Sequence, residues 1–91
     1  MNINIVVFIY PEESFFDEMI FLFKKLKHQT DKEDGCLQFD VYLHEEKFIL
    51  IEKWENQQSI DTHMSKDYTQ NFIGDTKPHI IKTEVYRLKG L

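Results

Sequence analysis

The spacing of the apolar residues changes several times along this chain, and the order of the changes restricts the fold. An Ile- and Val-rich run over residues 2–10 is bounded by Pro11 and is typical of a strand buried on both faces. Apolar residues then recur every three or four positions, with carboxylates early and cations late. This pattern predicts a helix over residues 13–31 that ends before Gly35. Alternation in residues 36–43 and a further run of strand formers in residues 48–55 predict an antiparallel hairpin.

The second half of the chain repeats the change from helix to strand. Asn56 offers an N-cap oxygen for a helix that contains His63, and Ser65 offers another for a segment that stops at Gly74. Two short helices or one kinked helix would result. Residues 80–88 alternate loosely and predict a fourth strand. The order β-α-β-β-α-β is that of the ferredoxin-like split βαβ unit, an α+β fold with four antiparallel strands and both helices on one face.

Such a sheet leaves its second face uncovered. Both sides of the first and third predicted strands nevertheless carry apolar residues. A large apolar surface of this kind needs a cover, and a second copy of the sheet is the simplest one. We therefore expect a homodimer whose two sheets close toward a barrel, a dimeric α+β barrel. Residues 1–91 make one domain, because chains divide into several cores only at greater lengths.

Charge and composition limit the partners. Eleven Lys and Arg against sixteen Asp and Glu give a net charge of −5, which repels nucleic acid and anionic membrane surfaces. The longest apolar run, residues 5–10, is far shorter than the roughly 20 residues that cross a bilayer. One cysteine cannot form an internal disulfide, and no signal-peptide pattern opens the chain. We expect a cytoplasmic protein without a nucleic-acid or membrane partner.

The motifs that bind common cofactors are missing. Only three glycines occur, and neither a phosphate-binding glycine loop nor a Cys-x-x-Cys pair is present. The four histidines fall on different predicted elements, without the spacing that gathers ligands around one ion: His28, His44, His63 and His79. The sequence therefore predicts neither a cofactor nor a metal.

His63 is the residue best placed for proton transfer. It follows Ile60 by three positions and precedes Met64, at the edge of the apolar stripe of its helix. An imidazole there would lie at the rim of the space between sheet and helices, where it can exchange a proton near neutral pH. The alternative is a helix-surface histidine that is hydrogen-bonded to a neighbour.

Two residues of the third predicted strand face the same side. Glu52 and Trp54 are two positions apart in a run that is otherwise apolar on that side. A carboxylate there needs a partner, for which Lys82 and Arg87 are the candidates. Trp54 either forms a wall for a flat aromatic substrate or fills the core.

The segment before the second strand carries three structural predictions. Cys36 is expected to be a small buried side chain with a high pKa rather than a nucleophile. Gly35 is expected to take a positive φ as the chain leaves the first helix. The acidic stretches 12–13 and 31–34 are predicted to be solvated helix ends without a function.

Three segments in this order resemble the antibiotic biosynthesis monooxygenase family: residues 33–39, residues 51–56, and Ile60, His63, Tyr68 and Phe72. The resemblance spans nearly the whole chain and implies a dimeric α+β barrel with a pocket between sheet and helices. It also implies one of several activities: cofactor-independent oxygenation of phenols and quinols, haem degradation, or isomerisation of a small phosphorylated sugar. Haem-degrading relatives carry Trp at the position of His63, which disfavours haem.

The quinol monooxygenase-like interpretation implies roles for four residues. A bound quinol or similar small aromatic substrate would reduce O₂ directly, without flavin or metal. His63 would be the catalytic base, Trp54 and Phe39 pocket walls, and Tyr68 a second polar contact. His63 and Trp54 follow from motif positions, whereas Phe39 and Tyr68 depend on the expected strand and helix registers.

Two alternatives stay open. The first is a non-catalytic dimeric α+β barrel that binds an apolar metabolite, or whose pocket is filled by its own Phe and Met side chains. The second is an isomerase of a small phosphorylated sugar, for which Lys66 and Lys82 are the candidate phosphate ligands.

Overall fold

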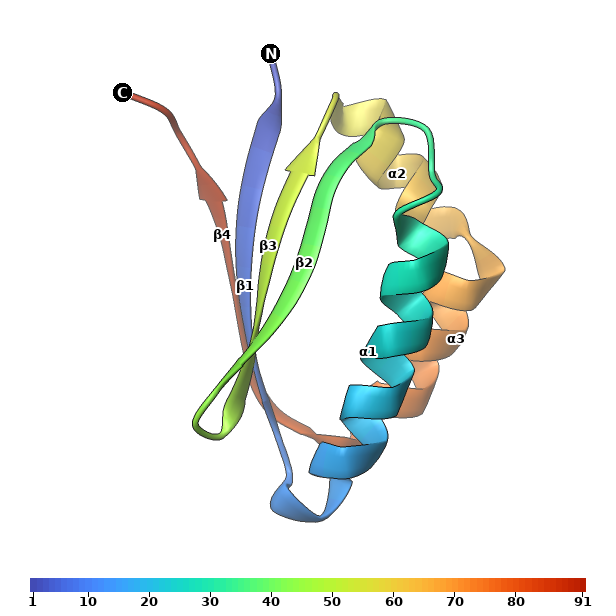
Figure 1. Cartoon of the computed structure of the whole chain (residues 1–91), viewed down its shortest axis with the longest axis vertical. Helices are drawn as coiled ribbons and strands as arrows, with labels where there is room; N and C mark the ends of the chain where they lie inside the picture. The colour runs from blue at the N-terminus through green and yellow to red at the C-terminus, as the bar shows by residue number, and fades with distance from the viewer.

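The computed structural model describes all 91 residues, Met1–Leu91, and has the predicted order of elements (Figure 1). Four strands and three helices, with two short 3₁₀ turns at Glu13–Phe15 and Lys77–His79, make up the chain. Their bounds are β1 Ile3–Pro11, α1 Phe16–Thr30, β2 Cys36–His44, β3 Lys47–Trp54, α2 Gln57–Ser65, α3 Asp67–Thr76 and β4 Ile80–Leu88. The second helical region is therefore two helices rather than one kinked helix.

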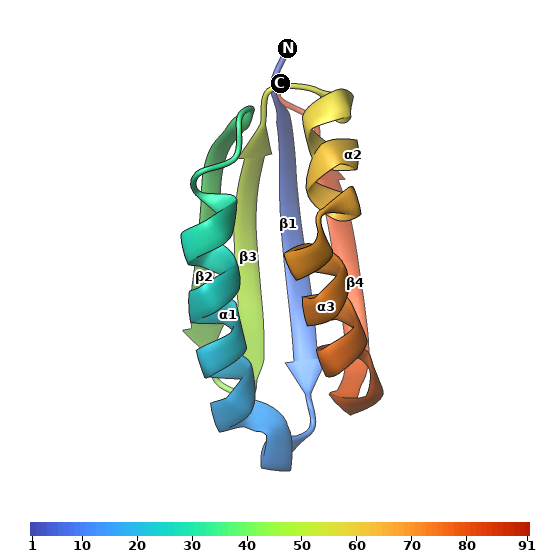
Figure 2. The ribbon, with the colours of Figure 1, turned by 90° about the vertical axis from the view of Figure 1, so that its right-hand side faces the viewer.

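The strands form one antiparallel sheet in the order β2-β3-β1-β4. Val7 of β1 pairs with Leu50 of β3 and with Val85 of β4, which places these residues on the same face. All three helices lie on that side of the sheet (Figure 2): α1 contacts β2, α2 contacts β3, and α3 packs against α1, while β4 stays more open, with Val85 63% exposed. The predicted ferredoxin-like α+β fold is confirmed.

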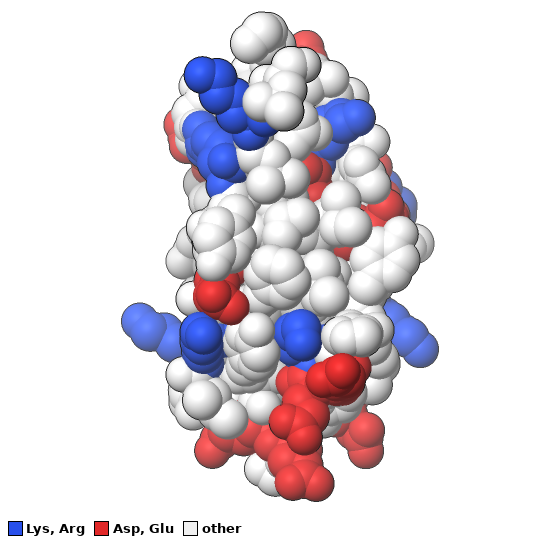
Figure 3. Space-filling view, turned by 90° about the vertical axis from the view of Figure 1, so that its left-hand side faces the viewer, with Lys and Arg blue, Asp and Glu red and all other residues white.

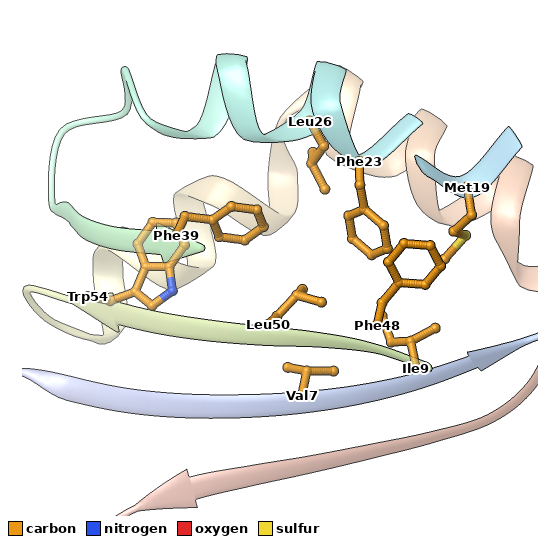
Figure 4. Close-up of a cluster of buried hydrophobic side chains, with 9 residues drawn as sticks. All are labelled: Val7, Ile9, Met19, Phe23, Leu26, Phe39, Phe48, Leu50 and Trp54. Carbon is orange, nitrogen blue, oxygen red and sulfur yellow. The ribbon is translucent and has the colours of Figure 1, made fainter. Parts of the chain in front are cut away.

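The core lies between the helices and the sheet (Figure 4). Phe23 of α1 packs against Phe48 of β3 and Phe72 of α3, with ring centroids 5.0 and 4.8 Å apart. Aromatic pairs at this spacing add to the stabilisation that burial gives. The buried apolar residues are Val7, Ile9, Met19, Phe23, Leu26, Phe39, Phe48, Leu50 and Trp54.

The start of α2 was predicted correctly and its end was not. Asn56 caps the helix, because its side-chain oxygen accepts a hydrogen bond from the Ser59 N–H at 2.9 Å. Ser65, predicted to cap the next helix, is instead the last residue of α2, and its hydroxyl donates to the carbonyl oxygen of Thr62 at 2.7 Å. Lys66 takes the extended conformation between the two helices, so the break falls one residue later than predicted.

Gly74 does not end α3, which continues to Thr76. Glycine inside a helix costs about 1 kcal/mol relative to alanine. Tertiary contacts offset this cost, because Thr76 is buried and its hydroxyl donates to the carbonyl oxygen of Phe72 at 2.8 Å, while Phe72 packs on α1. The stop at Gly74 was a local prediction that packing overrides.

The face of the sheet away from the helices is uncovered, as predicted (Figure 3). Uncharged side chains cover most of its centre; basic groups lie at one end and again closer to the other end, where acidic groups are concentrated. Its apolar and aromatic members include Val6, Phe8, Tyr42, Ile49, Ile51, Tyr86 and Leu88. No helix of this chain has both the length and the apolar character needed to cross a membrane.

Candidate functional site

The structure brings the four predicted site residues into one cluster. His63 of α2 faces the sheet, with its ring centroid 4.8 Å from that of Trp54 on β3 and 6.0 Å from that of Phe39 on β2. Trp54 and Phe39 are only 1% and 3% exposed. The side chain of His63 is 8% exposed, so it is buried rather than a solvated helix-surface histidine. Tyr68 of α3 joins the cluster through a fifth residue.

That fifth residue is Glu33, which was predicted to lie at a solvated helix end. This prediction is wrong, because the Glu33 side chain is only 6% exposed. Its Oε2 accepts hydrogen bonds from Nδ1 of His63, at 2.7 Å, and from the hydroxyl of Tyr68. A carboxylate is buried only where donors compensate for lost water, and here two donors from two helices do so. The signal in the sequence that could have pointed to Glu33 is its position at the start of residues 33–39, one of the segments that resemble the family.

Gly35 explains how a loop glutamate reaches α2. Its φ of +83° confirms the predicted turn, and its carbonyl oxygen accepts a hydrogen bond from the Glu55 N–H at 2.8 Å. A Cβ at this position would overlap the Ser59 hydroxyl and lie 2.6 Å from Ser59 Cβ. Only glycine lets the loop pass this close to the first turn of α2. Glu33, two residues earlier, then meets His63, one turn further along α2.

The hydrogen bond from Nδ1 determines what the other ring nitrogen can do. A carboxylate only accepts hydrogen bonds, so Nδ1 carries the proton. In the neutral ring the lone pair then belongs to Nε2. No hydrogen bond links Nε2 to another protein group, whereas Nδ1 is fully engaged. The ring is therefore arranged to accept a proton at Nε2.

Glu52 has a different partner from those predicted. Its Oε1 accepts a hydrogen bond from Nε1 of Trp54 at 2.8 Å. Lys82 pairs with Tyr10 and lies on the opposite face of the sheet, beside Glu84. Arg87 shares the face of Glu52 but is two strands away, about 10 Å at ordinary strand spacing. Burial raises the pKa of Glu52, which the Trp54 hydrogen bond partly opposes.

Cys36 adjoins the cluster without the properties of a nucleophile. Burial, and then the nearby carboxylates of Asp31, Glu33 and Glu52, raise the pKa of its thiol to about 11. The thiol is therefore protonated at neutral pH, in agreement with the interpretation as a small structural side chain.

Two surface cavities flank α1, and neither is lined by His63. One, of about 240 Å³, lies between α1 and α3 and is lined by Tyr68, Leu26 and Phe72 among others. The second, of about 160 Å³, lies between α1 and β2. Tyr68 thus connects the α1–α3 cavity with Glu33. No group of three or more His, Cys, Asp or Glu side chains is placed to hold a metal ion.

Comparisons with known proteins agree with this fold. The family described as antibiotic biosynthesis monooxygenase matches residues 2–75. The uncharacterised protein YjcS of Bacillus subtilis (strain 168) is 39% identical over 56 residues, 58% of this chain and 53% of YjcS, so the match spans about half of that relative.

Solved structures cover the chain more fully. Rv0793 from Mycobacterium tuberculosis superimposes with a TM-score of 0.92 at 18% identity, over 100% of this chain and 96% of its own. A conserved protein from Methanosarcina mazei Go1 gives a TM-score of 0.87 at 25% identity, over 98% and 94%. With the family match covering residues 2–75, the chain belongs to the antibiotic biosynthesis monooxygenase family.

Proposed function

We propose that this protein is a cofactor-independent monooxygenase that oxidises a quinol or another electron-rich aromatic compound with O₂. The observation that carries the proposal is the setting of His63: Nδ1 is bound to Glu33, Nε2 is without a protein partner, and two aromatic rings lie alongside. Membership of the family supports a monooxygenase-like function. The substrate class rests on the chemistry of the site.

In the proposed reaction the substrate supplies all the electrons. Nε2 of His63 accepts the proton of a phenolic hydroxyl, and the resulting phenolate is electron-rich enough to reduce O₂. Recombination gives a peroxide, to which His63 returns the proton. One oxygen atom enters the ring and the other leaves as water, so that a hydroquinone and O₂ become a hydroxyquinone and water. The protein moves one proton and excludes bulk water from the intermediates.

Trp54, Phe39 and Tyr68 are proposed as the walls of the substrate site. Trp54 and Phe39 would stack on a flat ring, and Tyr68 would mark the helical side of the site. Because Trp54 and Phe39 are nearly covered, a substrate must open the space next to Nε2.

Oxygen uptake tests the proposal. The wild type is mixed with a panel of hydroquinones, menadiol included, without added metal or flavin. We expect O₂ consumption above autoxidation, and a fall of about 10²–10⁴-fold in kcat for His63→Ala. His79→Ala is the matched control, because His79 is an exposed histidine that also contacts a glutamate, Glu12. Uptake no faster than autoxidation across the panel, or equal rates for wild type and His63→Ala, would overturn it.

A second candidate, a non-catalytic barrel with a pocket filled by its own side chains, has one observation in its favour. Phe23, Phe39, Phe48 and Trp54 fill the space between helices and sheet, and neither cavity beside α1 reaches His63. Binding of quinols without oxygen uptake would support this candidate. For the sugar isomerase, one candidate phosphate ligand, Lys82, lies on the face opposite His63, and the other, Lys66, is an exposed residue between α2 and α3.

We also propose a homodimer formed through the uncovered face of the sheet. Ile51, Tyr42 and Tyr86 are 37%, 52% and 48% exposed there, a large apolar area for a soluble surface. Both ends of this face carry cations: Lys53 lies at one end, and Lys47 and Lys82 lie at the other, near the hairpin turn that holds Glu45 and Glu46. A second copy that presents the same face would cover these apolar side chains in a symmetric pair.

A further inference from the structure

We propose that Glu33 is a positioning residue that holds His63 in the tautomer with a free lone pair at Nε2. Glu33 acts through His63 and does not itself touch the substrate. The catalytic consequence rests on the proposed function, whereas the effect on the tautomer concerns the protein alone.

The Glu33 carboxylate is held in one place by two donors. Glu33 and His63 are 30 residues apart in sequence, yet both side chains are more than nine-tenths buried and their polar atoms are 2.7 Å apart. The same Oε2 accepts the Tyr68 hydroxyl from a second helix. Burial and the contact with Glu33 raise the pKa of Tyr68, so this phenol remains a donor. Two donors therefore fix the carboxylate, and the carboxylate fixes the imidazole.

The alternative tautomer of His63 would be inactive as a base. With no acceptor at Nδ1, a neutral imidazole in water favours the proton on Nε2, where it blocks proton abstraction from a substrate. Which nitrogen is protonated is set by the hydrogen bond that the other makes. Loss of a carboxylate that holds a catalytic histidine in this way lowers kcat by up to about 10⁴-fold in serine proteases. Glu33 has the same relation to His63.

The chain also contains a natural comparison. Glu12 accepts a hydrogen bond from Nδ1 of His79 at 3.1 Å, but these side chains are 49% and 42% exposed. Water competes for both groups there, and little orientation is gained. The buried Glu33–His63 pair and the exposed Glu12–His79 pair thus differ mainly in burial.

The experiment compares Glu33→Leu and Glu33→Gln with the wild type and with Glu12→Leu as control. Nitrogen-15 chemical shifts of the His63 ring, in the neutral form and without substrate, report the tautomer. We expect the proton on Nδ1 in the wild type and in Glu12→Leu. Glu33→Leu removes the acceptor and Glu33→Gln can donate its amide N–H to Nδ1, so both variants move the proton to Nε2.

Kinetics give the second readout. We expect kcat to fall at least 10²-fold in both Glu33→Leu and Glu33→Gln, with KM little changed in either variant. A proton on Nε2 in the wild type, or an unchanged tautomer in folded Glu33→Leu, would overturn the inference. If Glu33→Leu does not fold, the tautomer of His63 in the wild type still tests the inference. Because the tautomer is read without substrate, its result stands even where no hydroquinone is oxidised, so failure of the proposed function is recognised separately.

Discussion

Replacing Gly35 with alanine tests whether the turn before β2 holds the site together. At φ +83° an alanine is strained by about 1–2 kcal/mol. Its Cβ would also lie 2.6 Å from Ser59 Cβ, and relieving such overpacking costs about 1–3 kcal/mol. Alanine also lowers the conformational entropy of the unfolded chain, which stabilises the folded state by about 0.4–1 kcal/mol and offsets part of this loss. We therefore expect Gly35→Ala to lower the free energy of unfolding by about 2–4 kcal/mol.

Two variants of Ser59 separate strain from overlap. The Ser59 hydroxyl can rotate away, but its Cβ cannot, so Ser59→Ala should rescue little. Ser59→Gly removes the Cβ and should restore the part of the loss that comes from overlap. In a double-mutant cycle, Gly35→Ala and Ser59→Gly should couple by about 1–3 kcal/mol. The φ strain at position 35 remains in the double variant.

Urea denaturation followed by Trp54 fluorescence measures these energies, and calorimetry should show a melting temperature lower by about 10 °C or more. The matched control is Gly74→Ala, because Gly74 lies inside α3 and a Cβ added there would have no atom within 4 Å. At that position alanine should stabilise the protein by about 0.5–1 kcal/mol. A loss below about 0.5 kcal/mol for Gly35→Ala, or no coupling to Ser59→Gly, would refute the reasoning.

Three further predictions concern other parts of the molecule. Burial raises the folded-state pKa of Glu52, so its charge lowers the stability of the protein at neutral pH, and this loss fades as pH falls through that pKa. Glu52→Gln can still accept the hydrogen bond from Trp54 and should be more stable than wild type in urea denaturation at pH 7. The gain in stability should shrink in acid. With a pKa of about 11, Cys36 should react with a disulfide reagent at pH 8 roughly a hundredfold more slowly than a free thiol, and a rate near that of free cysteine would contradict this. Ile51→Asp on the uncovered face should convert dimer to monomer in sedimentation velocity without changing the circular dichroism spectrum, and an unchanged sedimentation coefficient would speak against the dimer.

Features that depend on neighbouring residues were predicted correctly from this sequence, whereas features that depend on tertiary packing were not. Periodicity located all four strands, because alternation along a strand is a local property. Asn56 was recognised as a cap for the same reason. The cap predicted at Ser65 falls one residue later, at Lys66, and the stop predicted at Gly74 was wrong, because packing of α3 on α1 outweighs a small local preference.

The same distinction between local and tertiary features applies to the residues of the candidate site. His63 and Trp54 were predicted from their positions in a motif, and the structure places both of them, with Phe39 and Tyr68, in one cluster; their roles stay predictions. Glu33 was missed, because an acidic residue after a helix is usually solvated and its burial depends on contacts 30 residues away. Glu52 was correctly expected to need a partner, but the donor is its neighbour Trp54 rather than a distant cation.

The order of residues alone determined the α+β architecture, its uncovered sheet face and the glycine turn, since each depends on side-chain spacing or backbone freedom over a few positions. Only the tertiary structure decided which charges are buried and what they touch. The physical reason is that the desolvation of a carboxylate such as Glu33 depends on every group around it. Those groups come from α2 and α3, and the chain brings them together only when it folds.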